Sequence, residues 1–418
     1  MDIAKDFKDL LEKNDAQYGD RIALRYDPDD PGATMTYHEL YTMVMQRVTE
    51  LEGRRTVKVI DQGRLSWIIT MLGSVIGGHM TVLMDPALTP EYDDDIYDKN
   101  YLPGKLLFFT SGTTSKNKAV VLSQEALLHA TANGQQMLPC NMNDRLLSIL
   151  PLFHVFGFVC SFLWPLSQGA EIDLGTGYRG LMTDSLRYHP TIITAVPTLL
   201  DLLLRSDALN PELRMILIGA GPCRKELIDQ VIDKGVSIRF GYGLTETASG
   251  VAISISDHDP YSFCPCPDTR ASVTEDEELL ISTTSMMDGY YMHPELTGKK
   301  LTGGVLHTGD IAVIGENGAI TIIGRLDDVL VMPNGEKIYC PEVENDLVRH
   351  LEHECVLILR ENTLTLSVKA PSSEEPKIRT MIDDYNKTVP LSRKIRKVEI
   401  HEDDFPRTIT GKIQRYKI

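Results

Sequence analysis

The residues best suited to chemistry lie in a loop that follows a short apolar run. Residues 106–109 are apolar and predict a buried strand, and residues 110–118 then read Thr-Ser-Gly-Thr-Thr-Ser-Lys-Asn-Lys. The backbone N–H groups, the hydroxyls and the two lysines of such a loop could hold a polyphosphate. The Walker A pattern GxxxxGK[ST] is absent from it. A loop of this composition is also compatible with an ordinary surface connection.

Four more segments combine glycine with charged side chains. They are residues 241–247 (GYGLTET), 307–310 (HTGD), 324–328 (GRLDD) and 406–413 (PRTITGKI). Each charged group also has an ordinary structural explanation. Glu246 could cap a helix at its first turn, and Asp310 could be a turn residue. Lys412 could be a solvated lysine of the tail, and His154, in an apolar stretch, could be a satisfied core histidine.

Alternating strands and helices are expected to position these segments. Apolar runs at residues 106–109, 146–150, 191–196, 215–218 and 236–240 predict buried strands, with helices at residues 124–133 and 199–205 between them. This alternation is typical of an α/β body of parallel sheets covered on both faces. From about residue 272 to residue 324, short strands joined by Gly and Asn turns predict a small, mostly antiparallel β-subdomain.

A smaller unit is expected after residue 324. It contains a hairpin around residues 333–335, a helix that opens at residues 341–344, strands at 355–359 and 364–369, a further helix and a basic segment at 392–397. We therefore predict a body of residues 1–324, a junction at residues 325–328 and a C-terminal α+β domain of residues 329–418.

Composition and charge exclude some classes of protein. The 418 residues are 42% hydrophobic and 24% charged, which is enough to bury a sizeable core. The net charge of −17 argues against a protein whose whole surface binds nucleic acid or anionic lipid. Residues 146–170 are apolar and long enough to cross a bilayer. Because Pro151, Gly157, Pro165 and Gly169 interrupt them, we expect a buried strand, a turn and a core helix instead of a membrane span.

The cysteines and the N-terminus indicate a cytoplasmic protein. The seven cysteines are an odd number and are scattered along the chain, as is typical of reduced thiols. The first residues are acidic and contain no apolar signal segment.

Together these segments resemble those of the adenylate-forming superfamily, which includes acyl-CoA synthetases, peptide-synthetase adenylation domains and luciferases. The matches follow the family's order and cover nearly the whole chain: TSGTTSKNK, PLFHVFGF, GYGLTET, HTGD, GRLDDVLVMPNGEKI and TGK, with weaker echoes at residues 36–40, 278–281 and 288–291. The resemblance implies a two-step reaction. A carboxylate attacks the α-phosphorus of Mg-ATP to give an acyl-adenylate and pyrophosphate, and a thiol, usually that of CoA, then takes the acyl group.

The resemblance also implies roles for individual residues. The phosphate site would consist of Thr110, Ser111, Gly112, Thr113, Thr114 and Lys118. The adenine would lie between Tyr242, with Gly243 beside it, and the wall Gly219-Ala220-Gly221. Thr245 would touch the α-phosphate and Glu246 would bind Mg²⁺, an ion that prefers oxygen ligands. Asp310, helped by Arg325, would accept hydrogen bonds from the ribose.

Three further roles concern the reacting acid and the motion of the C-terminal domain. Lys412 would bridge the carboxylate and the α-phosphate, where a point cation is most useful. His154 would gate a carboxylate pocket lined by Val155, Phe156, Gly157, Val196, Gly219 and Gly243. Asp327 matches the family's hinge, so that the C-terminal domain would be a mobile lid.

The sequence departs from the family pattern at the phosphate loop, in its length and at the hairpin. Ser115, Asn117 and Ala119 replace two glycines and a proline, so we expect altered loop mobility with function retained. The chain is shorter than is typical of the family. The hairpin at residues 331–338 is one residue longer than in many aryl-CoA ligases, which favours an aliphatic acid.

The thiol acceptor stays open at this point, as does the oligomeric state. The basic residues 393–397 could meet the phosphates of CoA, could meet an acidic acyl or peptidyl carrier protein, or could be a solvated face. A third alternative is a degenerate, non-catalytic nucleotide-binding protein, which the altered loop favours and the retained charged residues disfavour.

Overall fold

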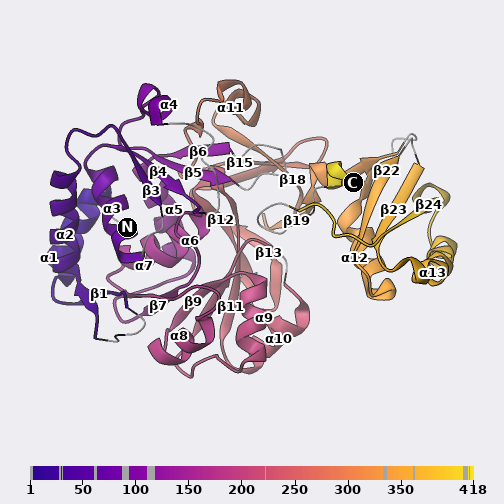
Figure 1. Ribbon diagram of the computed structural model, residues 1–418, viewed down its shortest axis with the longest axis horizontal. Helices are drawn as coiled ribbons and strands as arrows, with labels where there is room; N and C mark the ends of the chain where they lie inside the picture. The colour runs from indigo at the N-terminus through magenta and orange to yellow at the C-terminus, as the bar shows by residue number, and fades with distance from the viewer. Residues whose placement is uncertain are drawn as a thin grey trace.

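The computed structural model shows a large N-terminal body and a small C-terminal domain joined by a narrow connection (Figure 1). It describes residues 3–27, 30, 32–60, 64–86, 94–110, 118–221, 223–332, 337–360, 363–407, 413 and 415–418. The mixed α/β architecture agrees with the fold class that the sequence predicts.

One sheet of the described chain runs through the whole body. Its strand order is β14-β15-β18-β19-β13-β12-β11-β10-β9-β7-β8-β1-β2, and β17 pairs with β18. The strands from β11 to β1 are parallel neighbours, as continuous apolar runs predict. The bounds in this half are β1 Ile22–Arg25, β2 Thr34–Thr36, β7 Arg145–Ser148, β8 Glu171–Leu174, β9 Ile192–Ala195, β10 Met215–Ile218 and β11 Ser237–Leu244.

The antiparallel half of this sheet begins earlier than the sequence analysis expected. It comprises β12 Ser249–Ser256, β13 Asp259–Pro265, β14 Arg270–Val273, β15 Glu278–Ser282, β17 Leu301–Thr302, β18 Val305–Ile314 and β19 Ile320–Arg325. Because β11 turns directly into β12, the antiparallel strands start near residue 241 and not near 272. Residues 241–244 and 307–310, from two of the glycine-containing segments, lie within β11 and β18.

A second sheet has the order β16-β6-β5-β4-β3. Its strands are β3 Thr56–Ile60, β4 Met80–Met84, β5 Leu106–Thr110, β6 Lys118–Leu122 and β16 Gly289–Tyr290. Figure 1 shows α1 and α2 on the outer side of the body, with α3 between them and this sheet. The body helices are α1 Phe7–Tyr18, α2 Tyr37–Glu50, α3 Arg64–Ile76, α4 Asp94–Lys99, α5 Gln124–Met137, α8 Leu181–Tyr188, α9 Pro197–Arg205, α10 Lys225–Asp233 and α11 Pro294–Lys300.

The long apolar stretch at residues 146–170 is broken into short elements. It contains the end of β7, α6 Val155–Phe158, a π-helical turn Val159–Leu163 and α7 Trp164–Ser167, and most of its side chains are buried. Among the residues that the structure describes, no helix is long and apolar enough to cross a membrane. The expected strand, turn and core helix are confirmed.

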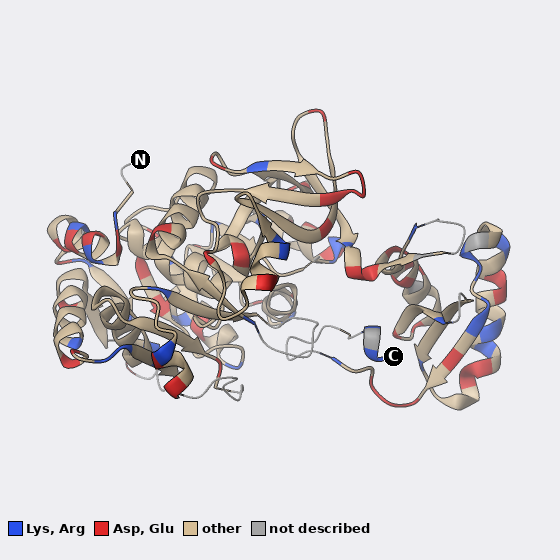
Figure 2. Ribbon diagram, turned by 90° about the horizontal axis from the view of Figure 1, so that it is seen from above, with Lys and Arg blue, Asp and Glu red and all other residues tan. Residues whose placement is uncertain are grey.

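The C-terminal domain has its own core. It consists of the hairpin β20 Val329–Val331 and β21 Lys337–Tyr339, the sheet β22 Cys355–Arg360, β23 Thr363–Lys369 and β24 Lys397–His401, and the helices α12 Cys340–Leu351 and α13 Glu375–Thr388. Leu347, Leu357, Leu366 and Ile378 belong to one buried cluster between helices and sheet. Acidic and basic residues are interspersed over this domain (Figure 2). The tip of the predicted hairpin, residues 333–336, lies outside the described residues.

Candidate functional site

The first cluster of the candidate site combines side chains of β11, β18 and β19 in the antiparallel half of the large sheet. The Tyr242 hydroxyl donates to Asp310 Oδ2 at 2.7 Å, and Arg325 Nη1 lies 3.0 Å from Asp310 Oδ1. Asp310 and Arg325 are opposite each other in the β18–β19 pairing, so the sheet itself sets the ion pair. Asp310 is buried within a strand, which makes its interpretation as a turn residue wrong.

The electrostatics of this cluster favour a polar ligand at the Asp310 carboxylate. Burial, and next the Asp310 charge, raise the pKa of Tyr242 well above its usual value, so the phenol keeps its proton and donates. Each carboxylate oxygen has two acceptor sites. Asp310 can therefore accept hydroxyl groups of a ligand while it holds Tyr242.

Two residues of the segments discussed above, Gly309 and Ala220, have a positive φ. Gly309 has φ +75°, and a Cβ placed on it would lie 3.2 Å from Lys300 Nζ and 3.4 Å from Arg325 Nη2. Ala220, in the predicted wall of residues 219–221, has φ +67°, which is rare for a residue with a Cβ. A non-glycine residue with positive φ, such as Ala220, is the kind of strained position that concentrates at functional sites.

The second cluster connects the base of the predicted phosphate loop to Glu246. Thr110 and Lys118 face each other at the ends of β5 and β6, and the Thr110 hydroxyl donates to the Lys118 carbonyl at 3.4 Å. Lys118 Nζ lies 5.8 Å from the ring centroid of Tyr290, a distance suited to a cation–π contact. The Tyr290 hydroxyl donates to Glu246 Oε1 at 2.6 Å.

The Glu246 carboxylate is the acidic group of this second cluster and lies in the first turn of a short 3₁₀ helix. It follows Thr245 in a turn of three residues, Thr245–Thr247, and there the Leu244 N–H donates to the Thr247 hydroxyl. Glu246 is half-buried. In the described part of the chain, no three His, Cys, Asp or Glu side chains gather as a metal site. One carboxylate is nevertheless a sufficient protein ligand for a Mg²⁺ ion that a nucleotide brings with it.

His154 lies at the start of α6, in the segment that the sequence predicts to gate a pocket. Burial lowers the pKa of His154 against an opposing effect of Asp85, so the imidazole is neutral at pH 7. Its ring centroid is 4.7 Å from that of Phe153. Phe156, the second residue of α6, packs on Gly219. A Cβ on Gly219 would lie 2.7 Å from the Phe156 ring.

One predicted site residue, Gly243, has a packing role as well, and several others lie outside the described residues. A Cβ on Gly243 would lie 1.8 Å from the Ser249 carbonyl oxygen, so close approach of β12 requires this glycine. Residues 111–117 and 408–412, which include Ser111, Gly112, Thr113, Thr114 and Lys412, lie outside the described residues.

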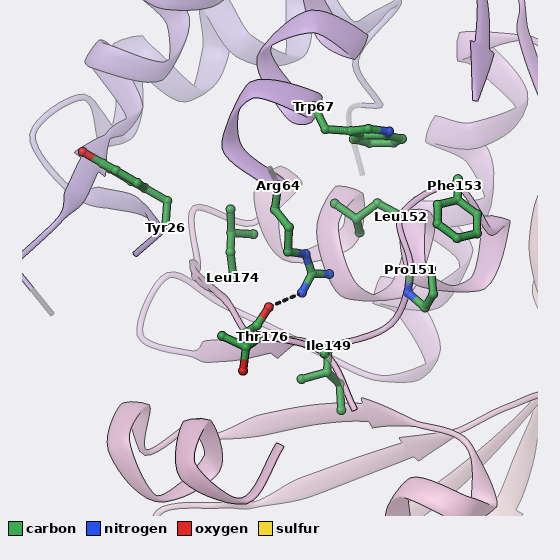
Figure 3. Close-up of a pocket in the computed structure, with 11 residues that line it drawn as sticks. Tyr26, Arg64, Trp67, Ile149, Pro151, Leu152, Phe153, Leu174 and Thr176 are labelled. Carbon is green, nitrogen blue, oxygen red and sulfur yellow. Dashed lines mark hydrogen bonds between the residues drawn. The ribbon is translucent and has the colours of Figure 1, made fainter. Parts of the chain in front are cut away.

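A pocket lies elsewhere in the body, at the carboxyl ends of β1, β7 and β8 (Figure 3). It has a volume of about 480 Å³, and it is lined by Tyr26, Arg64, Trp67, Ile149, Pro151, Leu152, Phe153, Leu174, Gly175, Thr176 and Gly177. None of the six residues expected to line an apolar pocket belongs to it. Sequence reasoning missed Arg64 and Trp67, because nothing in α3 alone indicates that its first turn faces two loops of the other sheet.

Comparisons with known proteins agree with this architecture. Residues 105–291 match the family model of the AMP-binding enzymes. The 2-succinylbenzoate–CoA ligase of Bacillus cereus (strain ATCC 10987 / NRS 248) is 26% identical over 334 residues, which are 75% of this chain and 64% of that protein. A feruloyl-CoA synthase of an Amycolatopsis species is 29% identical over 265 residues, 58% of this chain and 53% of that protein. The chain thus spans about 64% of the length of the first of these relatives.

Solved structures share the fold over nearly the whole chain. The O-succinylbenzoate coenzyme A synthetase of Bacillus subtilis, in complex with ATP and a magnesium ion, superposes with a TM-score of 0.81 at 21% identity and covers 98% of both chains. An anthranilate CoA ligase in complex with anthranoyl-AMP superposes with a TM-score of 0.80 at 21% identity, over 100% of this chain and 97% of that one.

Proposed function

We propose that this protein, a member of the adenylate-forming superfamily, activates a carboxylic acid with ATP and transfers the acyl group to the thiol of CoA. The observation that carries the proposal is the convergence of Tyr242, Asp310 and Arg325 in one hydrogen-bonded cluster. The relatives named above are CoA ligases, and this supports CoA as the acceptor.

The two clusters would divide the nucleotide between them. Asp310 would accept the ribose hydroxyls, and Tyr242 would lie against the base. Thr110 and Lys118, at the base of the loop, would hold phosphate oxygens together with residues 111–114. Thr245 would contact the α-phosphate, and Glu246 would hold Mg²⁺, which supplies charge neutralisation when it is bound.

The chemical step needs mainly positioning and charge stabilisation. Because the attacking carboxylate and the phosphates are both anionic, cations fixed near them lower the barrier. Lys118 is one such group, and we propose Lys412 as the second. Because the imidazole of His154 is neutral, it would place no charge beside the apolar part of a bound acid.

The experiment is an assay for both products. The protein is incubated with ATP, Mg²⁺, CoA and a panel of aliphatic and aromatic acids, and AMP and acyl-CoA are measured by chromatography and mass spectrometry. The panel contains both classes because the long hairpin favours an aliphatic acid, whereas the relatives are named for aromatic ones. Acid-dependent AMP with no acyl-CoA would identify a ligase that loads a carrier protein.

Asp310→Asn is the variant that tests the role of the Asp310 carboxylate in this assay. It removes the charge that faces Arg325 and keeps the size of the side chain, so the fold should remain and ATP use should fall by about ten-fold or more. Binding of ATP with no AMP formed from any acid would favour the non-catalytic alternative.

A further inference from the structure

We propose that the pocket between α3 and the loops after β7 and β8 is a second ligand site, for a small organic acid with an apolar body. This proposal does not rest on the adenylation function. Its residues are separate from the Tyr242–Asp310–Arg325 and Lys118–Tyr290–Glu246 clusters.

The place and size of the pocket suit a small molecule. Ligands of α/β sheets bind outside the carboxyl ends of parallel strands, and β1, β8 and β7 are adjacent parallel strands. The volume of about 480 Å³ lies within the usual range for such sites. Figure 3 shows side chains from α3, from the loop after β7 and from the loop after β8 around Arg64.

The walls are mostly apolar. Ile149, Leu152 and Leu174 line the pocket and are themselves at least nine-tenths buried, and Phe153 adds an aromatic ring. Such walls take an aliphatic or aromatic body in preference to a sugar or a nucleotide.

Trp67 supplies a hydrogen-bond donor that has no acceptor among the described residues. Its side chain is 3% exposed and lines the pocket, and its indole Nε1 has no hydrogen-bond partner among the described residues. The second tryptophan differs in this respect, since the Trp164 indole donates to Gln135 Oε1 at 2.7 Å. An unsatisfied buried donor is costly, so a ligand acceptor at Trp67 would satisfy it.

Arg64 gives the pocket its preference for an anion. The guanidinium donates to the carbonyls of Gly175 at 2.6 Å and Leu150 at 2.8 Å and to that of Ser148. These bonds fix a positive charge at the pocket wall, where a carboxylate would be attracted without a large rearrangement. An apolar body, one donor and one fixed cation together define an organic acid.

The test uses the fluorescence of Trp67 after the other tryptophan, Trp164, has been replaced. In Trp164→Phe, Trp67 is the remaining tryptophan, so a saturable change of its fluorescence on titration with octanoate or benzoate, without nucleotide, reports binding beside it. Octanol, which has the same chain length and no charge, should bind at least several-fold more weakly. Trp67→Phe keeps a ring but lacks the donor, and calorimetry should show a loss of affinity for octanoate of about ten-fold.

Each contrary result overturns a defined part of the proposal. No saturable change at Trp67 up to the solubility limit would exclude the site. Equal binding of octanol and octanoate would exclude the organic acid, and unchanged affinity in Trp67→Phe would exclude the indole as donor. Trp67→Phe should fold normally because it keeps an aromatic ring and removes an N–H that has no hydrogen-bond partner in the described part of the chain. Since the titrations contain no ATP, their failure leaves the adenylation proposal to its own assay.

Discussion

At the scale of single residues, His154 is a half-buried histidine at the N-terminus of α6. Its pKa is lowered by burial, whereas in the unfolded chain a histidine takes its proton near pH 6.5. The unfolded state therefore binds more protons just below this pH, and stability rises with pH through that window.

We expect the free energy of unfolding of the wild type to fall as the pH is lowered from 7 to 5, and His154→Gln to lose less over this interval. Urea denaturation at each pH measures both. The exposed His258 provides the control, since His258→Gln should retain the dependence of the wild type. A curve for His154→Gln that runs parallel to the wild type would contradict the assignment.

Tyr290 is the residue that couples the phosphate-loop base to the proposed metal ligand. Tyr290→Phe keeps the ring under Lys118 and removes the hydrogen bond to Glu246. We expect the Mg²⁺ concentration for half-maximal ATP binding to rise by up to about ten-fold, because the carboxylate loses the group that orients it. Calorimetric titration of Mg-ATP measures this without turnover.

The neighbouring tyrosine makes the control for this prediction. Tyr291 is buried, and its ring centroid lies 5.8 Å from that of Tyr97, on which it stacks. Tyr291→Phe should leave the Mg²⁺ requirement unchanged. An identical requirement in Tyr290→Phe and the wild type would show that Glu246 does not depend on this hydrogen bond.

At the scale of elements, β8 carries a buried carboxyl group that has no hydrogen-bond partner among the described residues. Asp173 is fully buried between β1 and β7, neither of its oxygens has a hydrogen-bond partner among the described residues, and Arg25 Nε lies 3.6 Å away. Burial raises the pKa of Asp173 well above its usual value. A raised carboxyl pKa contributes stability at low pH that is lost as the pH rises through the folded-state value.

Asp173→Asn should therefore stabilise the protein by about 1–3 kcal/mol at pH 8. The gain should shrink towards pH 4, where the carboxyl of the wild type is protonated. Thermal unfolding at both pH values measures the difference. A destabilised Asp173→Asn at pH 8 would mean that the ion pair with Arg25 outweighs the cost of burial.

The elements also show what the sequence can and cannot predict. The strands at residues 106–110 and 215–218 are clear from sequence because a run of apolar residues marks a strand buried on both faces. β13 was missed because an antiparallel strand with a polar, exposed face resembles a loop in composition. β12 is mostly buried, and its apolar residues 251–253 were not recognised as part of a strand. Tyr290 meets Glu246 across 44 residues because β16 pairs with β6, and no local pattern predicts such a pairing.

At the scale of the whole molecule, two polar contacts between the described residues connect the C-terminal hairpin to the body. Lys337 Nζ lies 3.1 Å from Asp276, and the Tyr339 hydroxyl donates to Glu277 at 2.7 Å. Both acidic side chains are exposed, and exposed pairs contribute little. The domain has its own core and could turn as a unit. We therefore propose Asp327, in the turn Leu326–Asp328, as the hinge between two orientations.

Asp327→Pro would fix φ at this position and remove a backbone donor. We expect it to impair one half-reaction at least ten-fold more than the other, because each step would need its own domain orientation. Acyl-AMP formation and thioester formation from synthetic acyl-AMP are measured separately. Equal losses in both, with an unchanged melting temperature, would place the hinge elsewhere.

The most direct test of the account is carboxylate-dependent exchange of labelled pyrophosphate into ATP, because this exchange requires the adenylation step alone. We expect exchange by the wild type with at least one acid of the panel and none without acid. Lys412→Ala should lose a few hundred-fold of this rate, which corresponds to roughly 3–4 kcal/mol of transition-state stabilisation. Absence of acid-dependent exchange in a wild type that binds Mg-ATP would contradict the proposed function, and normal exchange by Lys412→Ala would contradict the role of that lysine.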